Sequence, residues 1–368
     1  MVDNARNFDE LLELMFKRRH ERPGDVFVEL LNREKLVIAP GGYSAMGAQI
    51  AQQIYLDRSK KGLPTFNAFY GSGWAISAMM WALPDMGFHD LSMMTLIGRH
   101  IVSSAYPLPV ILDAETGFGT ETTLVRTVEA YHGMGVALAH LEDQDSESTR
   151  RCGNLGGKKC VEPEKMITKI RSWLAVSKSI DTSMRLMVRT DALTASNGGV
   201  ENAIERGKRY MDVEYRGLRP LILWADAMVD LKLIERWITE MRKHDSNMIL
   251  GINYSPNRDW AGYYRKHYKR APPSYQELFK NGEGFRLIWH TILQARADME
   301  ATWNVFADMA ENGAQALWKL HRRQRKHPVG DSQGMSNAIL WQEFEKNIGG
   351  EEASKRYEGS QGYKGSPI

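Results

Sequence analysis

The chain has 368 residues, 43% hydrophobic and 25% charged, a size that suits one large α/β domain or two ordinary ones. Its 48 basic residues nearly balance 45 acidic ones, and no apolar run approaches the roughly 18 residues that span a bilayer. These features exclude a membrane protein and make nucleic acid a poor candidate partner. The N-terminal residues also lack the apolar core of a signal peptide, so we expect a cytoplasmic protein.

Eight short apolar segments, bounded by Gly, Pro or polar residues, are predicted to be strands. In chain order they are LVIA at 36–39, FNAFYG at 66–71, LPVILDA at 108–114, VALAHLED at 136–143, RLMVRT at 185–190, RPLILWA at 219–225, NMILGIN at 247–253 and FRLIWHTI at 285–292. Most precede an amphipathic helical pattern, such as TTLVRTVEAYHGMG or ENAIERGKRYMD. Eight β/α units within roughly 250 residues predict a closed (β/α)8 TIM barrel rather than a doubly wound sheet.

The pattern changes after the eighth unit. We assign residues 1–312 to the catalytic barrel with an N-terminal helix, and residues 313–368 to a helical arm followed by a polar tail. The final segment, EASKRYEGSQGYKGSPI, contains too few apolar residues to build a core of its own.

Acidic residues follow several strands in succession, at the end where a barrel carries its reactive groups. Asp113 and Glu115 follow the third strand, Glu142 the fourth, Asp191 the fifth and Asp226 the sixth. Carboxylates converging on one barrel mouth repel each other unless a cation lies among them, and all-oxygen ligands favour Mg²⁺ or Mn²⁺. The alternative for any single acid is a helix N-cap or a loop salt bridge. Four acidic strand ends in succession exceed what capping requires.

The loop after the fourth strand, from about Asp143 to Pro163, is long enough to be a lid. It contains RRCGNLGGKKC, with both cysteines of the chain, Cys152 and Cys160. Cys152 follows two arginines and precedes several glycines and the pair Lys158 and Lys159, so its thiol is predicted to lie in positive potential and to ionise near neutral pH. The alternative is a phosphate-binding loop with an incidental cysteine.

Two further segments carry groups suited to a small anion. The sequence GINYSPNRDW after the seventh strand offers Asn253, Ser255 and Asn257 as neutral polar groups. The sequence GSGW after the second strand allows the backbone amides of residues 72–74 to approach an anion closely. Each segment alone is equally compatible with an ordinary turn.

The motifs LDAETGFG, HLEDQ, RRCGNLGGK, VRTDA and INYSPNRDW resemble, in order and rough spacing, those of the isocitrate lyase family. That family lies within the superfamily that includes 2-methylisocitrate lyase and phosphoenolpyruvate mutase. The resemblance covers roughly residues 36–300. It implies a (β/α)8 barrel, a homotetramer that exchanges its last helices between subunits, and Mg²⁺-dependent cleavage of isocitrate to glyoxylate and succinate in the glyoxylate cycle.

The resemblance also implies roles for individual residues. Asp113 would be the principal metal carboxylate, and Asp85, Glu115 and Glu142 would join the metal shell directly or through water. Cys152 would be the catalytic acid, with Arg189 and Glu142 as further catalytic residues. The residues implied to bind substrate are Ser72, Gly73, Trp74, Gly153, Asn154, Arg189, Asn253, Ser255 and Asn257.

Three positions depart from the family pattern. Asn154 replaces a histidine near the cysteine, Asp226 replaces a glutamate, and Asn257 replaces the second serine of an SPS turn. Each change exchanges one polar side chain for another, which indicates an altered site rather than an inactive one.

We therefore expect a metal-assisted, retro-aldol type cleavage of a 2-hydroxy tricarboxylate, with isocitrate as the substrate. One alternative is a lyase or hydrolase of the superfamily that acts on 2-methylisocitrate or another 2-hydroxy or 2-oxo acid. A second alternative is a non-catalytic barrel kept for binding or assembly. The complete set of metal acids and the cysteine in a glycine-rich loop argue against this second alternative.

Overall fold

The computed structural model describes residue 12, residues 22–145 and residues 155–357. The chain divides into two compact units. One unit runs from Arg22 to Arg296, and the other combines residues 1–21 with residues 297–368.

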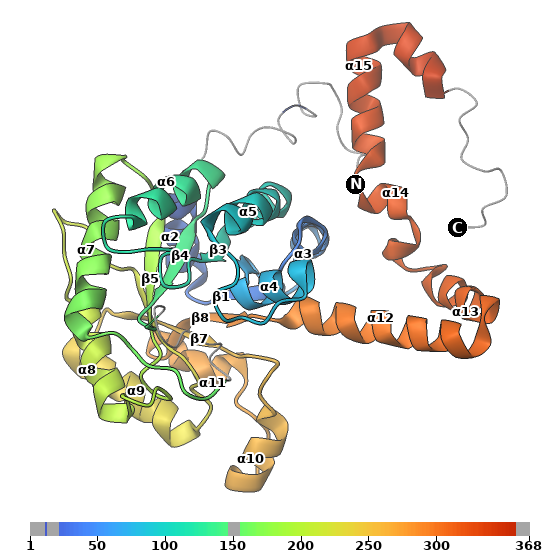
Figure 1. Ribbon diagram of the computed structural model, residues 1–368. Coiled ribbons are helices and arrows are strands. Elements are labelled where there is room, and N and C mark those ends of the chain that lie inside the picture. The colour runs from blue at the N-terminus through green and yellow to red at the C-terminus, as the bar shows by residue number, and fades with distance from the viewer. Residues whose placement is uncertain (1–11, 13–21, 146–154, 358–368) are drawn as a thin grey trace. The chain divides into compact units, whose positions relative to one another are not determined.

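The first unit is a closed barrel of eight parallel strands that pair in chain order, with β8 returning to β1. Each predicted segment overlaps one strand, and the first strand continues three residues beyond its predicted end at residue 39. The predicted barrel is therefore confirmed. Figure 1 shows the strands inside a surrounding layer of helices. The strands are β1 (Val37–Gly42), β2 (Phe69–Gly71), β3 (Val110–Asp113), β4 (Leu138–Glu142), β5 (Arg185–Thr190), β6 (Ile222–Ala225), β7 (Ile249–Asn253) and β8 (Phe285–His290).

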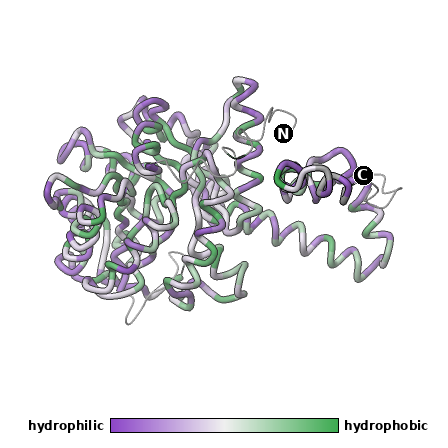
Figure 2. The backbone as a smooth tube through the Cα atoms, turned by 90° about the horizontal axis from the view of Figure 1, so that it is seen from above, coloured by the Kyte–Doolittle hydropathy of each residue, from purple (hydrophilic) through white to green (hydrophobic). Residues whose placement is uncertain are grey.

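Helices connect successive strands, and α6 and α8 contain the two helical patterns predicted above. The helices of this unit are α2 (Pro23–Glu34), α3 (Ala45–Lys60), α4 (Gly73–Trp81), α5 (Leu91–Ala105), α6 (Leu124–Met134), α7 (Pro163–Ser179), α8 (Val200–Met211), α9 (Leu231–His244), α10 (Trp260–Tyr268), α11 (Tyr275–Phe279) and the first residues of α12 (Leu293–Asn312). In Figure 2 the colour of the outer helices changes repeatedly between hydrophobic and hydrophilic, as expected for helices that bury one face.

The barrel interior is filled by one cluster of buried side chains, contributed by alternate residues of the strands. These residues include Val37, Ala39, Tyr70, Ile111, Leu138, Met187, Ile222, Trp224, Leu287 and Trp289, and α2 adds Phe27, Leu30 and Leu31. Since successive side chains of a strand point to opposite faces, the residue two positions beyond each of these also points inward. The interior positions of β3, β5 and β6 therefore lead to Asp113, Arg189 and Asp226.

The second unit continues α12 and adds α13 (Ala314–Gln324), α14 (Ser332–Met335) and α15 (Ala338–Tyr357). The predicted end of the barrel domain at residue 312 coincides with the end of α12, and Gly313 follows with a φ of 57°. The compact units divide earlier, between Arg296 and Ala297. Among the residues that the structure describes, no helix combines the length and apolar character that a membrane span requires.

Candidate active site

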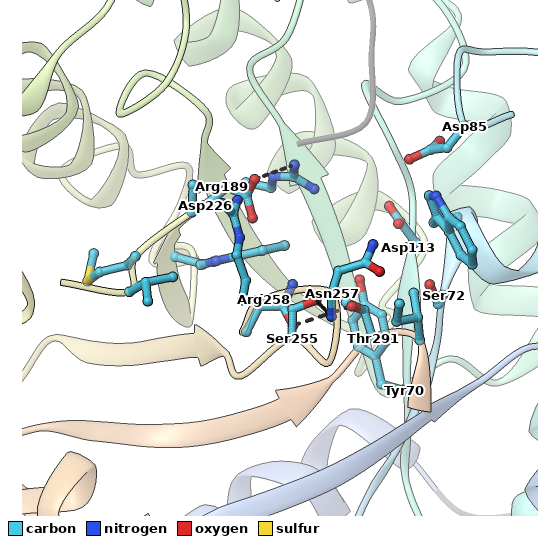
Figure 3. Close-up of a pocket in the computed structure, with 17 residues that line it drawn as sticks. Tyr70, Ser72, Asp85, Asp113, Arg189, Asp226, Ser255, Asn257, Arg258 and Thr291 are labelled. Carbon is cyan, nitrogen blue, oxygen red and sulfur yellow. Dashed lines mark hydrogen bonds and ion pairs between the residues drawn. The ribbon is translucent and has the colours of Figure 1, made fainter. Parts of the chain in front are cut away.

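A pocket lies among residues that end the strands or follow them directly. It brings together eight of the predicted site residues from five separate motifs: Ser72, Trp74, Asp85, Asp113, Arg189, Asn253, Ser255 and Asn257. Figure 3 shows Ser72, Asp85 and Asp113 on one side of this pocket and Arg189 and Asp226 on the other. The pocket thus occupies the end of the barrel at which such folds carry active sites.

Asp113, at the end of β3, is 7% exposed and is held by several neighbours. Its Oδ1 accepts a hydrogen bond of 2.9 Å from the Glu115 amide and lies 3.1 Å from His140 Nδ1. The same nitrogen lies 3.2 Å from the hydroxyl oxygen of Tyr70. These contacts fix the Asp113 carboxylate while part of it still faces the pocket.

Gly73 supports Asp113 directly. Its amide donates a 3.2 Å hydrogen bond to Asp113 Oδ2. A Cβ at this position would lie 2.1 Å from Glu115 Oε1 and 2.8 Å from Asp113 Oδ2, so only glycine fits. From the sequence Gly73 is expected to bind substrate, whereas in the structure its amide holds the carboxylate of Asp113, the predicted metal ligand.

Glu115 and Glu142 are buried and do not line the pocket. His89 Nε2 lies 3.1 Å from Glu115 Oε1, and Arg189 Nη1 lies 2.9 Å from Glu142 Oε2. Glu115 adopts a left-handed φ of 53°, an uncommon conformation for a residue with a side chain. Their assignment as metal ligands remains a prediction, and contact through water suits their position better than direct contact.

Arg189 is the centre of an ion-pair network at the end of β5. Its guanidinium lies 2.7 Å from Asp191 Oδ2 and 3.4 Å from Asp226 Oδ2, in addition to the Glu142 contact. It also lies over the Trp224 ring, 4.4 Å from the centroid. Burial raises the pKa of Glu142 well above its usual value, although the Arg189 charge opposes this. Burial alone would also raise the pKa of Asp191, but the Arg189 and Lys158 cations hold it below its usual value.

Lys158 lies in surroundings that differ from those that the sequence predicts. The sequence GGKK placed this lysine among the groups that give Cys152 a positive surrounding. The structure instead buries Lys158, with its Nζ 2.5 Å from Asp191 Oδ1 and 3.6 Å from Asp226 Oδ2. Lys158 and Arg189 therefore offset most of the charge of Glu142, Asp191 and Asp226 without a metal.

The carboxylates that face the pocket fit Mg²⁺. Asp85 and Asp113 supply oxygen ligands there, and Mg²⁺ in proteins is usually held by one or two carboxylates while it keeps several waters. Within residues 22–145 and 155–357, no group of three or more His, Cys, Asp or Glu side chains is arranged as a metal site.

The strand-end acids do not act as helix N-caps. Helices α6, α7 and α8 begin after Thr123, Glu162 and Gly199 without a capping side chain, and α9 is capped by Asp230 rather than Asp226. The capping alternative therefore fails for the acids around the pocket, whereas the salt-bridge alternative holds for Asp191 and Asp226.

The turn after β7 presents Asn253, Ser255 and Asn257 to the pocket, as predicted. Ser255 Oγ accepts a 3.2 Å hydrogen bond from the Asn257 amide, and its carbonyl oxygen accepts one of 3.0 Å from Trp260 Nε1. The Trp260 ring stacks on Tyr254 at a centroid distance of 4.1 Å. These contacts make the turn a rigid wall of the pocket.

The long loop after β4 closes on itself at its base. The Asp145 amide donates to the Lys159 carbonyl at 2.9 Å, and the Val161 amide donates to the Asp143 carbonyl at 2.9 Å. Cys160 lies in this base, and its thiol donates to Asp143 Oδ1 at 3.3 Å. The predicted residues Cys152, Gly153 and Asn154 lie outside the described residues.

Several residues of the site are not indicated by the sequence motifs. Arg258, Thr291 and Trp224 line the pocket, and His140 holds Asp113 from below. The β4 alternation could have identified His140, because it precedes Glu142 by two positions on the same face. Thr291 directly follows β8, a strand end at which the sequence pattern indicates no candidate residue.

Comparison with known proteins agrees with this architecture. A family model described as phosphoenolpyruvate phosphomutase matches residues 27–213. An isocitrate lyase from Haloferax volcanii is 28% identical over 91% of this chain and 89% of its own length. A 2-methylisocitrate lyase from Aeropyrum pernix is 27% identical over 85% of this chain and 88% of its own length.

Solved structures show the same fold. A crystal structure of 2,3-dimethylmalate lyase, described as a member of the PEP mutase/isocitrate lyase superfamily, superposes with a TM-score of 0.64. It is 23% identical in sequence and covers 85% of this chain and 96% of that chain. At this identity the likeness concerns the barrel and not the substrate.

Proposed function

Because this chain belongs to the phosphoenolpyruvate phosphomutase family and is a carbon-carbon lyase, we propose that it cleaves isocitrate to glyoxylate and succinate. The observation that carries the proposal is the pocket, in which Asp113, Arg189 and the Asn253–Asn257 turn meet although they lie far apart in the sequence. The resemblance implies roles in isocitrate cleavage for these residues.

Mg²⁺ bound at Asp85 and Asp113 would act as a Lewis acid on the hydroxyl and carboxylate oxygens of the substrate. The residues of the chain orient the rest of the molecule. The α4 N-terminus and Ser72 face the glyoxylate end of the substrate, and the Trp74 amide lies in the first turn, where helices favour anions. Asn253 and Ser255 would hold the carboxylates of the succinate end.

A base removes the hydroxyl proton, the oxygen forms the carbonyl of glyoxylate, and the bond between the hydroxyl-bearing carbon and its neighbour breaks. The electron pair of that bond remains on the succinate fragment as negative charge. Arg189 lines the pocket and would stabilise this charge electrostatically. Cys152 would then deliver a proton to the carbanion, as the resemblance implies.

Isocitrate is expected to be preferred over 2-methylisocitrate by about 10- to 200-fold in kcat/KM, the range that one methyl group allows. The additional methyl group lies at the glyoxylate end, where Trp74 lines the pocket, and a filled pocket turns the methyl group into strain. The check is a substrate panel with purified protein and Mg²⁺, following glyoxylate and pyruvate release. In the variant Trp74→Phe, the ratio of kcat/KM for isocitrate to kcat/KM for 2-methylisocitrate should decrease. An equal or higher kcat/KM for 2-methylisocitrate in the unaltered protein would assign it to the other lyase.

We also propose that the protein is a homotetramer. The helices of the second unit expose large aromatic side chains, with Trp303 76%, Phe306 67% and Trp318 59% exposed. Such residues normally mark a protein interface. Light scattering should give a mass four times the chain mass of 41.9 kDa, and the double substitution Trp303→Ser/Phe306→Ser should lower it. A monomeric mass for the unaltered protein would contradict the proposal.

A further inference from the structure

Arg258 is a cation of the pocket that has no assigned role. It follows the Asn253–Asn257 turn, and its side chain lines the pocket together with Asn253, Ser255 and Asn257. In the described part of the chain, no hydrogen bond or ion pair of its guanidinium is present. A guanidinium has five N–H donors and matches a carboxylate in two-pronged geometry.

The other arginine of the pocket is differently placed. Three carboxylates, those of Glu142, Asp191 and Asp226, lie within 3.4 Å of the Arg189 guanidinium. Lys158 shares two of the same acids, so three carboxylates face two cations on that side. Arg258 is therefore the pocket-lining cation, among the residues described, whose charge is available to a ligand.

The backbone holds Arg258 in place. Its amide donates a 3.1 Å hydrogen bond to the Ser255 carbonyl, within the turn that Trp260 fixes from behind. The next residue, Asp259, caps α10 by accepting a 2.8 Å hydrogen bond from the Gly262 amide. A guanidinium carried by a rigid turn loses less conformational freedom when it binds a ligand.

Isocitrate and 2,3-dimethylmalate differ in their number of carboxylates. Isocitrate carries a third carboxylate at the far end of its succinate half, whereas 2,3-dimethylmalate carries a methyl group there and only two carboxylates. We propose that Arg258 binds this third carboxylate and so makes the enzyme select tricarboxylates over dicarboxylates. The inference rests on the proposed lyase function and adds the residue that determines its substrate class.

The test compares Arg258→Met with the unaltered full-length protein on isocitrate and on 2,3-dimethylmalate, with Mg²⁺ present. We expect kcat/KM for isocitrate to fall roughly 10- to 100-fold, mostly through KM, which is what one charge-assisted hydrogen bond contributes. The kcat/KM for 2,3-dimethylmalate should stay within about twofold or rise. An equal loss on both substrates, or no loss on either, overturns the assignment.

Lys266→Met is the matched control. Lys266 is an exposed cation of α10 that shares an outer groove with Arg258 but does not line the pocket. It should leave both substrates unaffected, which separates direct contact from the general potential of this surface. If Lys266→Met reproduces the isocitrate loss, Arg258 acts only through that potential and the assignment fails.

A binding measurement keeps this inference separate from the proposed function. Isothermal titration calorimetry can measure the binding of succinate and of propionate in the presence of Mg²⁺, and this measurement does not depend on catalytic turnover. We expect Arg258→Met to weaken succinate binding about 10-fold or more without changing propionate binding, and Arg258→Lys to recover part of the loss. If the protein does not cleave isocitrate but shows this binding pattern, the isocitrate assignment is rejected and the role of Arg258 in carboxylate binding is retained. If the protein cleaves isocitrate but does not show this binding pattern, the role of Arg258 is rejected and the proposed lyase function is retained.

Discussion

Replacing Asp113 with asparagine is expected to lower kcat/KM for isocitrate by at least about 10³-fold, because the substitution removes the charge that would hold Mg²⁺. Asparagine has nearly the same shape as aspartate and keeps one side-chain oxygen. That oxygen can accept a hydrogen bond from the amide of Gly73 or of Glu115, so the barrel should stay folded. Steady-state kinetics and thermal unfolding of the same preparation check both parts.

Chelation provides the companion experiment for Asp113. EDTA should abolish the activity of the unaltered enzyme and Mg²⁺ should restore it, and Mg²⁺ should raise the melting temperature of the unaltered protein but not that of Asp113→Asn. Asp230→Asn, which retains an N-cap for α9 outside the pocket, is the matched control and should respond to Mg²⁺ like the unaltered protein. Full activity of Asp113→Asn, or of the chelated enzyme, would remove the metal from the mechanism.

The charge balance of the site changes the reason for expecting Mg²⁺ at Asp113. From the sequence alone, the convergent acids predict a metal ion that relieves their mutual repulsion. The structure shows that Glu142, Asp191 and Asp226 are paired with Arg189 and Lys158. The case for Mg²⁺ therefore rests on Asp85 and Asp113, which face the pocket, rather than on the number of strand-end acids.

The barrel could be predicted because its signals are local. Each strand is a short apolar run, and each is separated from the next by a helical pattern of the length that a parallel crossover requires. The inward direction of Asp113 and Arg189 also follows from strand alternation. Since these rules depend only on neighbouring residues, the strand positions and much of the pocket follow from the sequence.

The burial and ion pairing of Lys158 could not be predicted, because they depend on residues distant in the sequence. In the sequence GGKK a lysine is expected to be exposed, and only the fold brings it to Asp191, which lies 33 positions away. Gly73 illustrates the same limit. Its motif indicated an anion-binding amide, and only the structure shows that Asp113 is the anion that it binds.

Cys152→Ser is expected to lose about 10² to 10⁴ of kcat, the usual contribution of a positioned proton donor, while Cys160→Ser stays near normal. The prediction for Cys152 rests on the family resemblance, which implies that Cys152 is the catalytic acid. The prediction for Cys160 rests on its surroundings. Cys160 is 3% exposed, its thiol donates to Asp143, and its backbone is hydrogen-bonded on both sides by Asn197.

Burial and the neighbouring Asp143 charge raise the pKa of the Cys160 thiol well above its usual value, so it holds its proton too tightly to donate it. A serine at position 160 can make the same hydrogen bond to Asp143 and serves as the matched control for a change in the loop. Iodoacetamide should label Cys152 in the native protein and leave Cys160 unlabelled, because only a thiolate reacts. Mass spectrometry of the labelled peptides separates the two. Equal losses of kcat in the two serine variants would mean that both cysteines support the loop and that the proton donor is another group.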